Sequence, residues 1–433
     1  MARIVLTNAQ LFDGQSAPRR GVHVVVSGRR IESLSEGPVP ETGADDRTHD
    51  LAGRTLMPGM VQGHFHSHFG AFGTGISSPI LGLEASPAYH GILAARNVQT
   101  ALNCGFTSII GSSNADGVDL AVKDAVGHGL IPGPRILACT REFMTTGEQA
   151  DGNNSSWFMN LGNRGLTRTL DGADQWRHAA REEIGRGCDV VKVSSGQGHG
   201  AAPTVDECYM TDAELEAVVS VAHSRGALVR SHCPTRPAIL QAARLSVDII
   251  DHADRIDPEC IDEILKAGSI VAPSMLFSFR LMQMIDNWDP ASGPFPMGGA
   301  AGEEGEDAQA RVRLMREDWE HTCRYMPEAA AAGIKMIVGD DFGVPGMPHG
   351  DYGSELELYV KQLGVSAQEV LTWATRNGAS LMGRGDELGT VAPGKLADLI
   401  VVEGDPLSDI TCLKDPARVS AVIKNGEWLK DTL

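Results

Sequence analysis

Residues 211–232, TDAELEAVVSVAHSRGALVRSH, combine one helix pattern with one strand pattern. The start Thr211-Asp212-Ala213-Glu214 resembles a helix N-cap with a glutamate near the third helical position, and it predicts a helix over Asp212 to Ser224. The short apolar run Leu228 to His232 then predicts a buried strand. A helix followed at once by a buried strand is the repeating unit of folds with a parallel sheet.

The same alternation extends over about 330 residues and predicts a (β/α)8 TIM barrel across residues 58–388. A doubly wound open sheet is the competing fold, but the Gly-rich phosphate turn typical of its first strand is absent from the sequence. The predicted strands are Met60 to His66, Phe106 to Ile110, Pro134 to Ala138, Asp189 to Val193, Leu228 to His232, Asp248 to Asp251, Ile270 to Ala272 and Lys335 to Gly339. The predicted helices include Ala85 to Asn103, Ala173 to Arg186, Asp212 to Ser224 and Ala308 to Ala332.

Both ends of the chain have a different pattern, in which short β-rich runs are separated by turn residues. Chain termini usually lie close together at a domain surface, so we expect residues 1–57 and 389–433 to form one small composite β-sandwich domain. The expected strands are Ile4 to Leu6, Val22 to Val26, Ile31 to Leu34, Leu396 to Val402, Val419 to Ile423 and Glu427 to Leu429, the last after an Asn425-Gly426 turn.

Composition restricts the partners. The chain has 37 Lys and Arg against 56 Asp and Glu, a net charge of −19, which argues against nucleic acids and anionic membranes because phosphate binding needs clustered cations. The sequence has neither an 18-residue apolar window nor the pattern of a secretory signal. The eight Cys are scattered without a CxxC pair, which favours reduced thiols and a cytoplasmic location. We expect a small-molecule substrate and, from general frequencies, a homo-oligomer.

Two stretches interrupt the βα alternation and are expected to be functional covers or mobile loops. Residues 141–171 carry aromatic side chains among Gly, Asn and Ser, and residues 286–307 are rich in Pro, Gly and acidic residues. In the barrel interpretation both follow the C-terminal end of a strand, which is where such barrels place their active sites.

Metal-ligating residue types gather at the ends of the predicted strands. His64 and His66 end the first strand, where residues two apart point to the same side. His232 ends the fifth strand and His252 follows the sixth. Asp340 and Asp341 follow the eighth. Four imidazoles and a carboxylate suit zinc or another borderline transition metal, with cobalt, manganese and iron as alternatives, and do not suit calcium or magnesium.

Lys192 closes the fourth strand at the same pole. An ammonium beside divalent ions would be repelled, and burial favours the neutral amine. A neutral amine can react with carbon dioxide to form a carbamate, an anion whose two oxygens can bridge two metals. The alternative is a lysine that extends its amine to solvent from a strand end. Its place in the constellation favours the carbamate.

Ordered motifs along nearly the whole chain resemble the metal-dependent amidohydrolase superfamily, in its imidazolonepropionase-like and prolidase-like branch. The matching segments are PGMVQGHFHSH (58–68), GPRIL (133–137), VVKVSSGQ (190–197), AHSRGALVRSH (222–232), VDIIDHA (247–253) and, most specifically, LGTVAPGKLADLIVVEGDPLSDI (388–410).

The resemblance implies two divalent metal ions. His64 and His66 would hold one ion with the eighth-strand aspartate, and His232 and His252 the other, with carbamylated Lys192 as the bridge. The family pattern Gly-Thr-Asp assigns the ligand to Asp341 and puts Asp340 in place of Thr, although strand alternation leaves the choice open. Asp341 is then also the catalytic residue. It accepts a proton from the metal-bound water, which leaves the attacking hydroxide, and it passes that proton to the leaving amine.

The expected reaction is hydrolysis of a C–N bond at a carbonyl, in an amide, urea or carbamate of a small, partly apolar molecule. Cyclic amide ring opening of the imidazolonepropionase type and deamination are the alternatives; a deaminase would usually lack the bridging lysine. A non-catalytic scaffold is disfavoured because every ligand type is present. Gln62 and the segment Thr145 to Asp151 depart from the family pattern and argue against a standard dipeptidase. His349 is a candidate substrate contact, with a surface loop histidine as the alternative.

Overall fold

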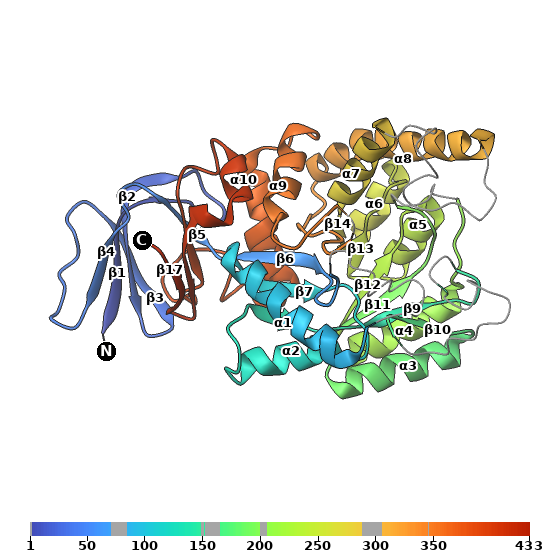
Figure 1. The fold of residues 1–433 in the computed structure, drawn as a ribbon, viewed down its shortest axis with the longest axis horizontal. Helices are drawn as coiled ribbons and strands as arrows, with labels where there is room; N and C mark the ends of the chain where they lie inside the picture. Colours follow the sequence, from blue (N-terminus) through green and yellow to red (C-terminus); the bar gives the residue numbers. More distant parts are fainter. Residues whose placement is uncertain are drawn as a thin grey trace.

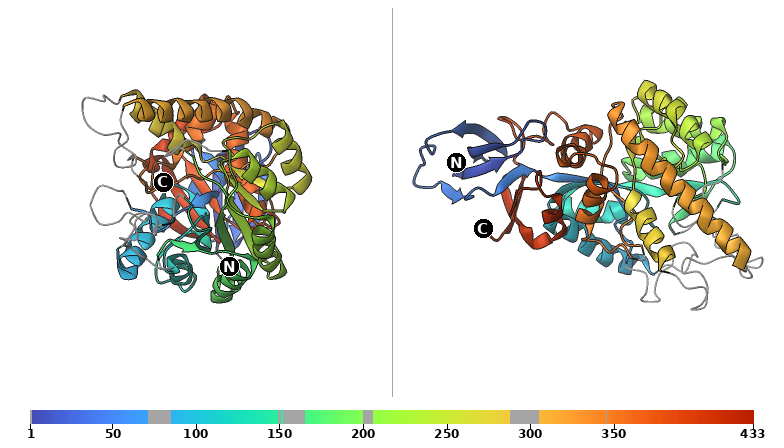
Figure 2. Two further views of the ribbon diagram at one scale, coloured as in Figure 1. Left: turned by 90° about the vertical axis from the view of Figure 1, so that its right-hand side faces the viewer. Right: turned by 90° about the horizontal axis from the view of Figure 1, so that it is seen from above.

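The computed structural model describes residues 2–70, 85–148, 151, 165–199, 206–287, 305–344 and 346–433. The fold is mixed α/β and has two parts: a β-rich part that holds both termini, and a larger part in which helices lie outside the strands (Figures 1 and 2). Every helix within these ranges is too short or too polar to cross a membrane.

Strands from both ends of the chain join in one eight-stranded sheet, in the order β17-β16-β15-β5-β1-β2-β3, with β4 paired to β1. The predicted Asn425-Gly426 turn is present, with φ of 53° and 77°, the left-handed conformation that tight hairpins need. The strands are β1 (Arg3–Leu11), β2 (Arg19–Ser27), β3 (Arg30–Glu36), β4 (Arg47–Asp50), β5 (Thr55–Pro58), β15 (Leu399–Val402), β16 (Val419–Lys424) and β17 (Glu427–Asp431).

The larger part is built on two parallel sheets. One has six strands in the order β10-β9-β11-β12-β13-β14, and the other has three in the order β6-β7-β8. Seven of the eight predicted strands are present within one residue at either end. The strands are β6 (Met60–Phe65), β7 (Phe106–Gly111), β8 (Arg135–Leu137), β9 (Cys139–Met144), β10 (Thr167–Thr169), β11 (Val190–Ser194), β12 (Leu228–His232), β13 (Ile249–Asp251) and β14 (Ile270–Ala272).

The eighth predicted strand, Lys335 to Gly339, is a single β-bridge from Met336 to Val271. The Ile337 N–H donates to the Val271 carbonyl at 3.0 Å, and on the other side the Gly63 N–H donates to the Val338 carbonyl at 2.7 Å. The segment therefore lies between β14 and β6, but its pairing is too short to count as a strand.

Helices α1, α3, α4 and α8 confirm the predicted helices, with α3 and α4 at the predicted bounds. The capping box is also present: the Glu214 carboxylate accepts the Thr211 N–H at 2.9 Å. The helices are α1 (Pro87–Asn103), α2 (Val118–Gly127), α3 (Ala173–Arg186), α4 (Asp212–Ser224), α5 (Arg236–Arg244), α6 (Pro258–Ala267), α7 (Met275–Asp286), α8 (Gly305–Ala331), α9 (Tyr352–Lys361), α10 (Ala367–Thr372), η4 (Trp373–Asn377), α11 (Gly378–Leu381), η5 (Ile410–Lys414) and η6 (Pro416–Arg418).

The two stretches expected to be loops contain more regular structure than the sequence indicated. Residues 141–144 belong to β9, and β10 lies within 165–171; residues 286 and 305–307 belong to α7 and α8. Residues 149, 150, 152–164 and 288–304 lie outside the described residues, so the cover predicted there stays a prediction.

Two apolar layers define the inner and outer faces of the parallel strands. Val61, Ile110, Val190, Ile249 and Ile337 form one cluster, contributed by strands of both parallel sheets and by the 335–339 segment. Val191 and Val193 belong instead to the large cluster that packs against the helices. Because side chains alternate along a strand, Lys192 and Ser194 must share the inner face with Val190.

Candidate metal centre

Two histidines and one aspartate converge at the C-terminal end of β6. The Nε2 atoms of His64 and His66 lie 3.2 Å apart, and each lies 3.0 Å from Asp341 Oδ1. Ligand atoms around one tetrahedral zinc, at its usual bond length of about 2.1 Å, lie about 3.4 Å apart. The three atoms thus have the spacing of ligands to a single ion.

Gly339 permits this close approach of the eighth segment to β6. Its φ of 142° lies in the region that favours glycine, and a Cβ atom there would stand 2.1 Å from the His64 backbone nitrogen. A larger residue would therefore push Asp341 and His64 apart.

A second group of possible ligands contains His252, which follows β13, together with His199 and the same Asp341. Sequence reasoning missed His199. It lies in the loop after β11, the same strand edge that identified Lys192, but no repeating pattern marks a loop residue. Burial alone lowers the pKa of His199, but the carboxylate of Asp254, 3.1 Å from His199 Nδ1, raises it to about 9.

His232 lies at the end of β12, beside this second group without joining it. Its ring centroid is 4.6 Å from that of His252 and 6.5 Å from that of His199. Its Nε2 atom is buried and has no hydrogen-bond partner in the described structure. Burial lowers the pKa of His232 to about 3, so the ring is neutral and can offer a nitrogen lone pair.

Lys192 is buried on the inner face of β11. Its Nζ atom lies 2.6 Å from Asp251 Oδ2 and 3.4 Å from Ser112 Oγ. Asp251 also contacts His64, whose Nδ1 lies 3.4 Å from Asp251 Oδ1. The carboxylate of Asp251 therefore connects Lys192 to the first group of ligands.

Arg230, in the strand that carries His232, is fully buried and was not recognised from the sequence as a site residue. Its guanidinium donates to both Asp251 oxygens, at 2.6 and 3.1 Å, and to the carbonyls of Gly63 and Gly111, at 3.0 and 2.7 Å. It thereby joins β12 to β13, β6 and β7 close to the candidate ligands.

The two consecutive aspartates have different surroundings. Asp341 Oδ1 faces His64 and His66, whereas Asp340 Oδ2 accepts the Leu276 N–H at 2.6 Å and its Oδ1 accepts the Asp341 N–H at 2.7 Å. Burial raises the pKa of Asp340 to about 7. Burial also acts to raise the pKa of Asp341, but the neighbouring imidazoles hold it well below the usual value. Of the two, Asp341 is the carboxylate directed at the histidines.

His349 has both ring nitrogens engaged. Its Nδ1 lies 2.9 Å from the Tyr352 hydroxyl, and its Nε2 lies 3.2 Å from the His66 carbonyl oxygen. In this arrangement it supports the backbone of a metal-ligand candidate, and a substrate contact would require one of these bonds to break.

The donor set fits borderline divalent ions. Nitrogen and carboxylate oxygen are the atoms available, and the described residues offer no thiol at the site. Burial lowers the pKa of His66 to about 4 and that of His252 well below its usual value, which keeps both rings neutral. Buried, unpartnered nitrogens on His199, His232 and His252 are the atoms that would be left unsatisfied without a bound partner.

Two further carboxylates belong to the surroundings of the centre. Glu142 pairs in register with Lys192, so both side chains lie on the same face of the sheet, and burial raises the pKa of Glu142. Glu148 contacts the Ser194 hydroxyl and accepts the Thr145 N–H at 3.3 Å; burial raises its pKa to about 8. The sequence marked Glu148 only as part of a departure from the family pattern.

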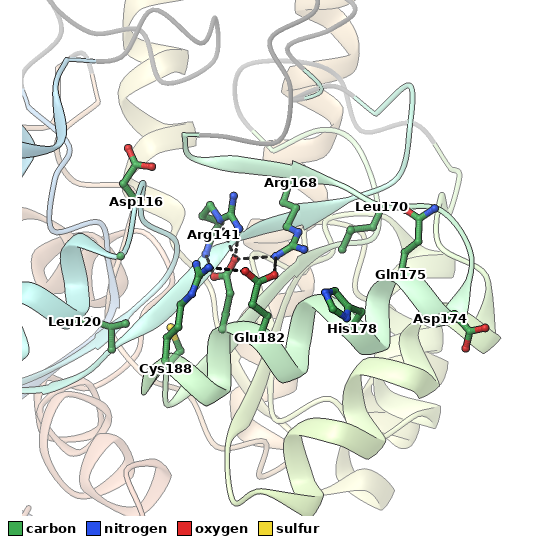
Figure 3. Close-up of a pocket in the computed structure, with 13 residues that line it drawn as sticks. Asp116, Leu120, Arg141, Arg168, Leu170, Asp174, Gln175, His178, Glu182 and Cys188 are labelled. Carbon is green, nitrogen blue, oxygen red and sulfur yellow. Dashed lines mark hydrogen bonds and ion pairs between the residues drawn. The ribbon is translucent and has the colours of Figure 1, made fainter.

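A cavity of about 860 Å³ lies elsewhere, between α3 and strands β9 and β10 (Figure 3). Arg141 pairs with Glu183 at 2.7 Å, and Arg168 with Glu182 at 2.9 Å. These arginine and glutamate side chains of the cavity therefore pair with one another between α3 and the strands. None of the predicted site residues lines the cavity.

Comparisons with known proteins agree with this fold. The model of the Amidohydrolase family matches residues 55–429. Ochratoxinase from Aspergillus niger is 26% identical over 439 residues, covering 97% of this chain and 85% of that protein. Imidazolonepropionase from Acidiphilium cryptum (strain JF-5) is 22% identical over 413 residues, covering 92% and 91%. The crystal structure of a Xaa-Pro dipeptidase with bound methionine has 25% identity and a TM-score of 0.84, covering 99% and 100% of the two chains.

The family match and the named hydrolases among these relatives show a hydrolytic enzyme that acts on C–N bonds. The chain belongs to the amidohydrolase family, which confirms the resemblance found in the sequence motifs.

Proposed function

We propose that this protein is a binuclear metal-dependent hydrolase that cleaves a C–N bond at a carbonyl in an amide, urea or carbamate. Its substrates are small, partly apolar molecules. The convergence of His64, His66, His252 and Asp341 at one edge of the parallel strands, in a chain of the amidohydrolase family, carries the proposal.

The proposed framework is a closed (β/α)8 barrel over residues 58–388, with a composite β-sandwich from residues 1–57 and 389–433. The bonds of the 335–339 segment to β14 and β6 support closure on one side. On the other side β8 pairs with β7, and β9, one residue later, pairs with β11. The shared apolar core of the terminal sheet supports the small domain.

His64, His66 and Asp341 are proposed to hold one ion, and His232 and His252 the second, with a carbamate on Lys192 as the bridge. Zinc suits the donors best, and cobalt, manganese or iron are alternatives. Ions bound there supply a water of lowered pKa and a Lewis acid for the substrate carbonyl.

Asp341 performs the proton transfers. Its carboxylate is ionised and partly exposed, at 19% of the side chain, so that it can meet both water and substrate. It accepts the proton that the attacking water loses and passes it to the leaving nitrogen. His349, bonded to the His66 carbonyl, and Ser274, whose hydroxyl lies 3.3 Å from His64 Nδ1, hold the two histidines in orientation.

Ring opening of a cyclic amide is the second candidate, favoured by the similarity to the imidazolonepropionase from Acidiphilium cryptum. Deamination is less favoured because a deaminase would usually lack the bridging lysine, the role proposed here for Lys192. A cytoplasmic location, supported by eight unpaired cysteines, and a homo-oligomeric assembly complete the proposal.

The test is a substrate panel of N-acyl amino acids, anilides, phenylureas, carbamates and cyclic imides, offered to chelator-treated protein and to the same protein reloaded with zinc, cobalt or manganese. We expect hydrolysis of at least one open-chain class by the reloaded protein alone. Turnover of cyclic substrates only would select the second candidate, and equal turnover by the chelated protein would contradict metal dependence.

Replacing Lys192 by Ala should lower both the metal content and the activity. Short carboxylic acids such as acetate and propionate should restore part of each, because they can occupy the place of the carbamate. Lys192→Arg keeps the positive charge beside Asp251 but cannot form a carbamate, so it is the matched control. Full metal loading in both variants would rule out a carbamate bridge on Lys192. Normal metal loading in Lys192→Arg, with low loading in Lys192→Ala, would mean that Lys192 serves only as the partner of Asp251.

A further inference from the structure

His199 is fixed in an unusual position over the candidate metal centre. Its backbone φ of 66° lies in the left-handed region, which a residue with a Cβ rarely adopts. His252, onto which it stacks, also has a positive φ, 69°. Strained backbone of this kind persists where the surrounding structure holds it, and it clusters at functional sites.

Asp254 sets the orientation of the His199 ring. Nδ1 lies 3.1 Å from both carboxylate oxygens, and both side chains are buried. With Nδ1 engaged, the nitrogen left over is Nε2. It is buried, has no hydrogen-bond partner in the described structure, and lies 3.9 Å from Asp341 Oδ2.

The stacking of His199 on His252 argues against a shared ion. The ring centroids are 3.6 Å apart and the planes differ by 22°. A metal ion binds an imidazole nitrogen along its lone pair, which lies in the plane of the ring. In two stacked and nearly parallel rings these lone-pair directions lie in separate planes, so they do not meet at one nearby ion. The short separation of their nitrogens follows from the stacking itself.

We propose that His199 is a further catalytic residue, which hydrogen-bonds through Nε2 to the scissile amide, urea or carbamate group, and that Asp254 is its positioning residue. The inference rests on the proposed function. The proposed hydrogen bond from His199 Nε2 is made to the reacting group of the substrate, beside Asp341, so it contributes to turnover. An imidazole held by a carboxylate at its other nitrogen is pre-oriented, and its hydrogen bond costs little reorganisation.

The test compares His199→Phe and His252→Phe with the wild-type protein, all reloaded with zinc. Phenylalanine keeps a ring stacked at either position and removes both nitrogens. We expect His199→Phe to retain the wild-type metal content, with kcat on the best substrate of the panel lowered about 10²- to 10³-fold. His252→Phe should lose metal.

A loss of metal by His199→Phe equal to that of His252→Phe would overturn the inference in favour of a ligand role. Normal metal with kcat within about threefold of wild type would overturn it as well. If the wild-type protein hydrolyses nothing in the panel, the proposed function and this inference fall together; if only the variant comparison fails, the proposed function stands.

Asp254→Asn provides a milder variant should His199→Phe fail to fold. It should lower kcat about tenfold with KM and metal content unchanged, because the ring keeps a hydrogen-bond partner but loses the negative charge that holds the imidazole in orientation. Combined with His199→Phe, it should lower kcat no further, since the two residues act through one nitrogen. Additive losses would contradict the positioning role.

Discussion

Replacing Asp341 by Asn should lower kcat/KM about 10³-fold or more while the protein remains folded. Asparagine has the same shape but no negative charge, so it neither takes the proton of the attacking water nor completes the charge of the His64 and His66 group. A positioned general base contributes about 10²- to 10⁴-fold by itself. Loss of a metal ligand would add to this. Steady-state kinetics on the best substrate, with metal analysis of the same sample, provides the measurement.

Asp340→Asn is the matched control, one residue away. Its carboxylate accepts two backbone N–H groups, from Leu276 and Asp341, and does not face the histidines. The variant should lose about 1–3 kcal/mol of stability, because one backbone N–H loses its acceptor. At temperatures below its melting transition, its kcat/KM should stay within about tenfold of the wild-type value. If Asp341→Asn keeps more than a tenth of the activity, or if Asp340→Asn is the inactive variant, the assigned ligand and base are wrong.

Replacing Arg230 by Met should destabilise the metal-free protein by about 3–5 kcal/mol, because it removes one partner from a buried ion pair. Asp251 would keep Lys192 and the contact with His64, and the carbonyls of Gly63 and Gly111 would lose the Arg230 donor inside the strands. Methionine fills a similar volume, so most of the loss reflects unsatisfied polar groups and not a cavity. The shift of the urea unfolding midpoint, measured without metal, reports the effect.

Arg244→Met is the control for arginine replacement in general. Arg244 lies on α5, is about half exposed, and pairs with Glu259 at 2.8 Å at the surface. Exposed pairs of this kind contribute about 0–1 kcal/mol, so the variant should unfold close to the wild-type midpoint. Equal midpoints for Arg230→Met and Arg244→Met would show that the buried network contributes little.

Periodicity predicted the parallel strands closely because their inner and outer faces are both apolar. Leu228–His232 has the predicted bounds, and the ligand candidates that end or follow strands, His64, His66 and His252, lie within reach of Asp341. The C-terminal ends of parallel strands lie along the same edge, so residues that end adjacent strands come close together. That topological fact made much of the candidate site readable from the sequence.

The remaining features depend on contacts that no local pattern encodes. β9 follows β8 after a single residue, and its residues 141–144 fall in a stretch predicted to be a loop, because Cys139–Met144 lacks a clear apolar alternation. The segment at Lys335 forms only one bridge, although its composition is that of a strand. His199 lies beside the centre in a loop with a left-handed backbone, and Arg230 lies in a predicted strand, where no sequence pattern marks the four hydrogen bonds that it donates.

The central claim is that side chains distant in sequence hold a pair of divalent ions. Elemental analysis of zinc-reloaded protein, after removal of loosely bound metal, tests it most directly. We predict about two ions per chain for the wild-type protein, and about one or fewer when His64 and His66 are both replaced by Asn. Wild-type protein that retains about one ion per chain or fewer would contradict the claim of a pair.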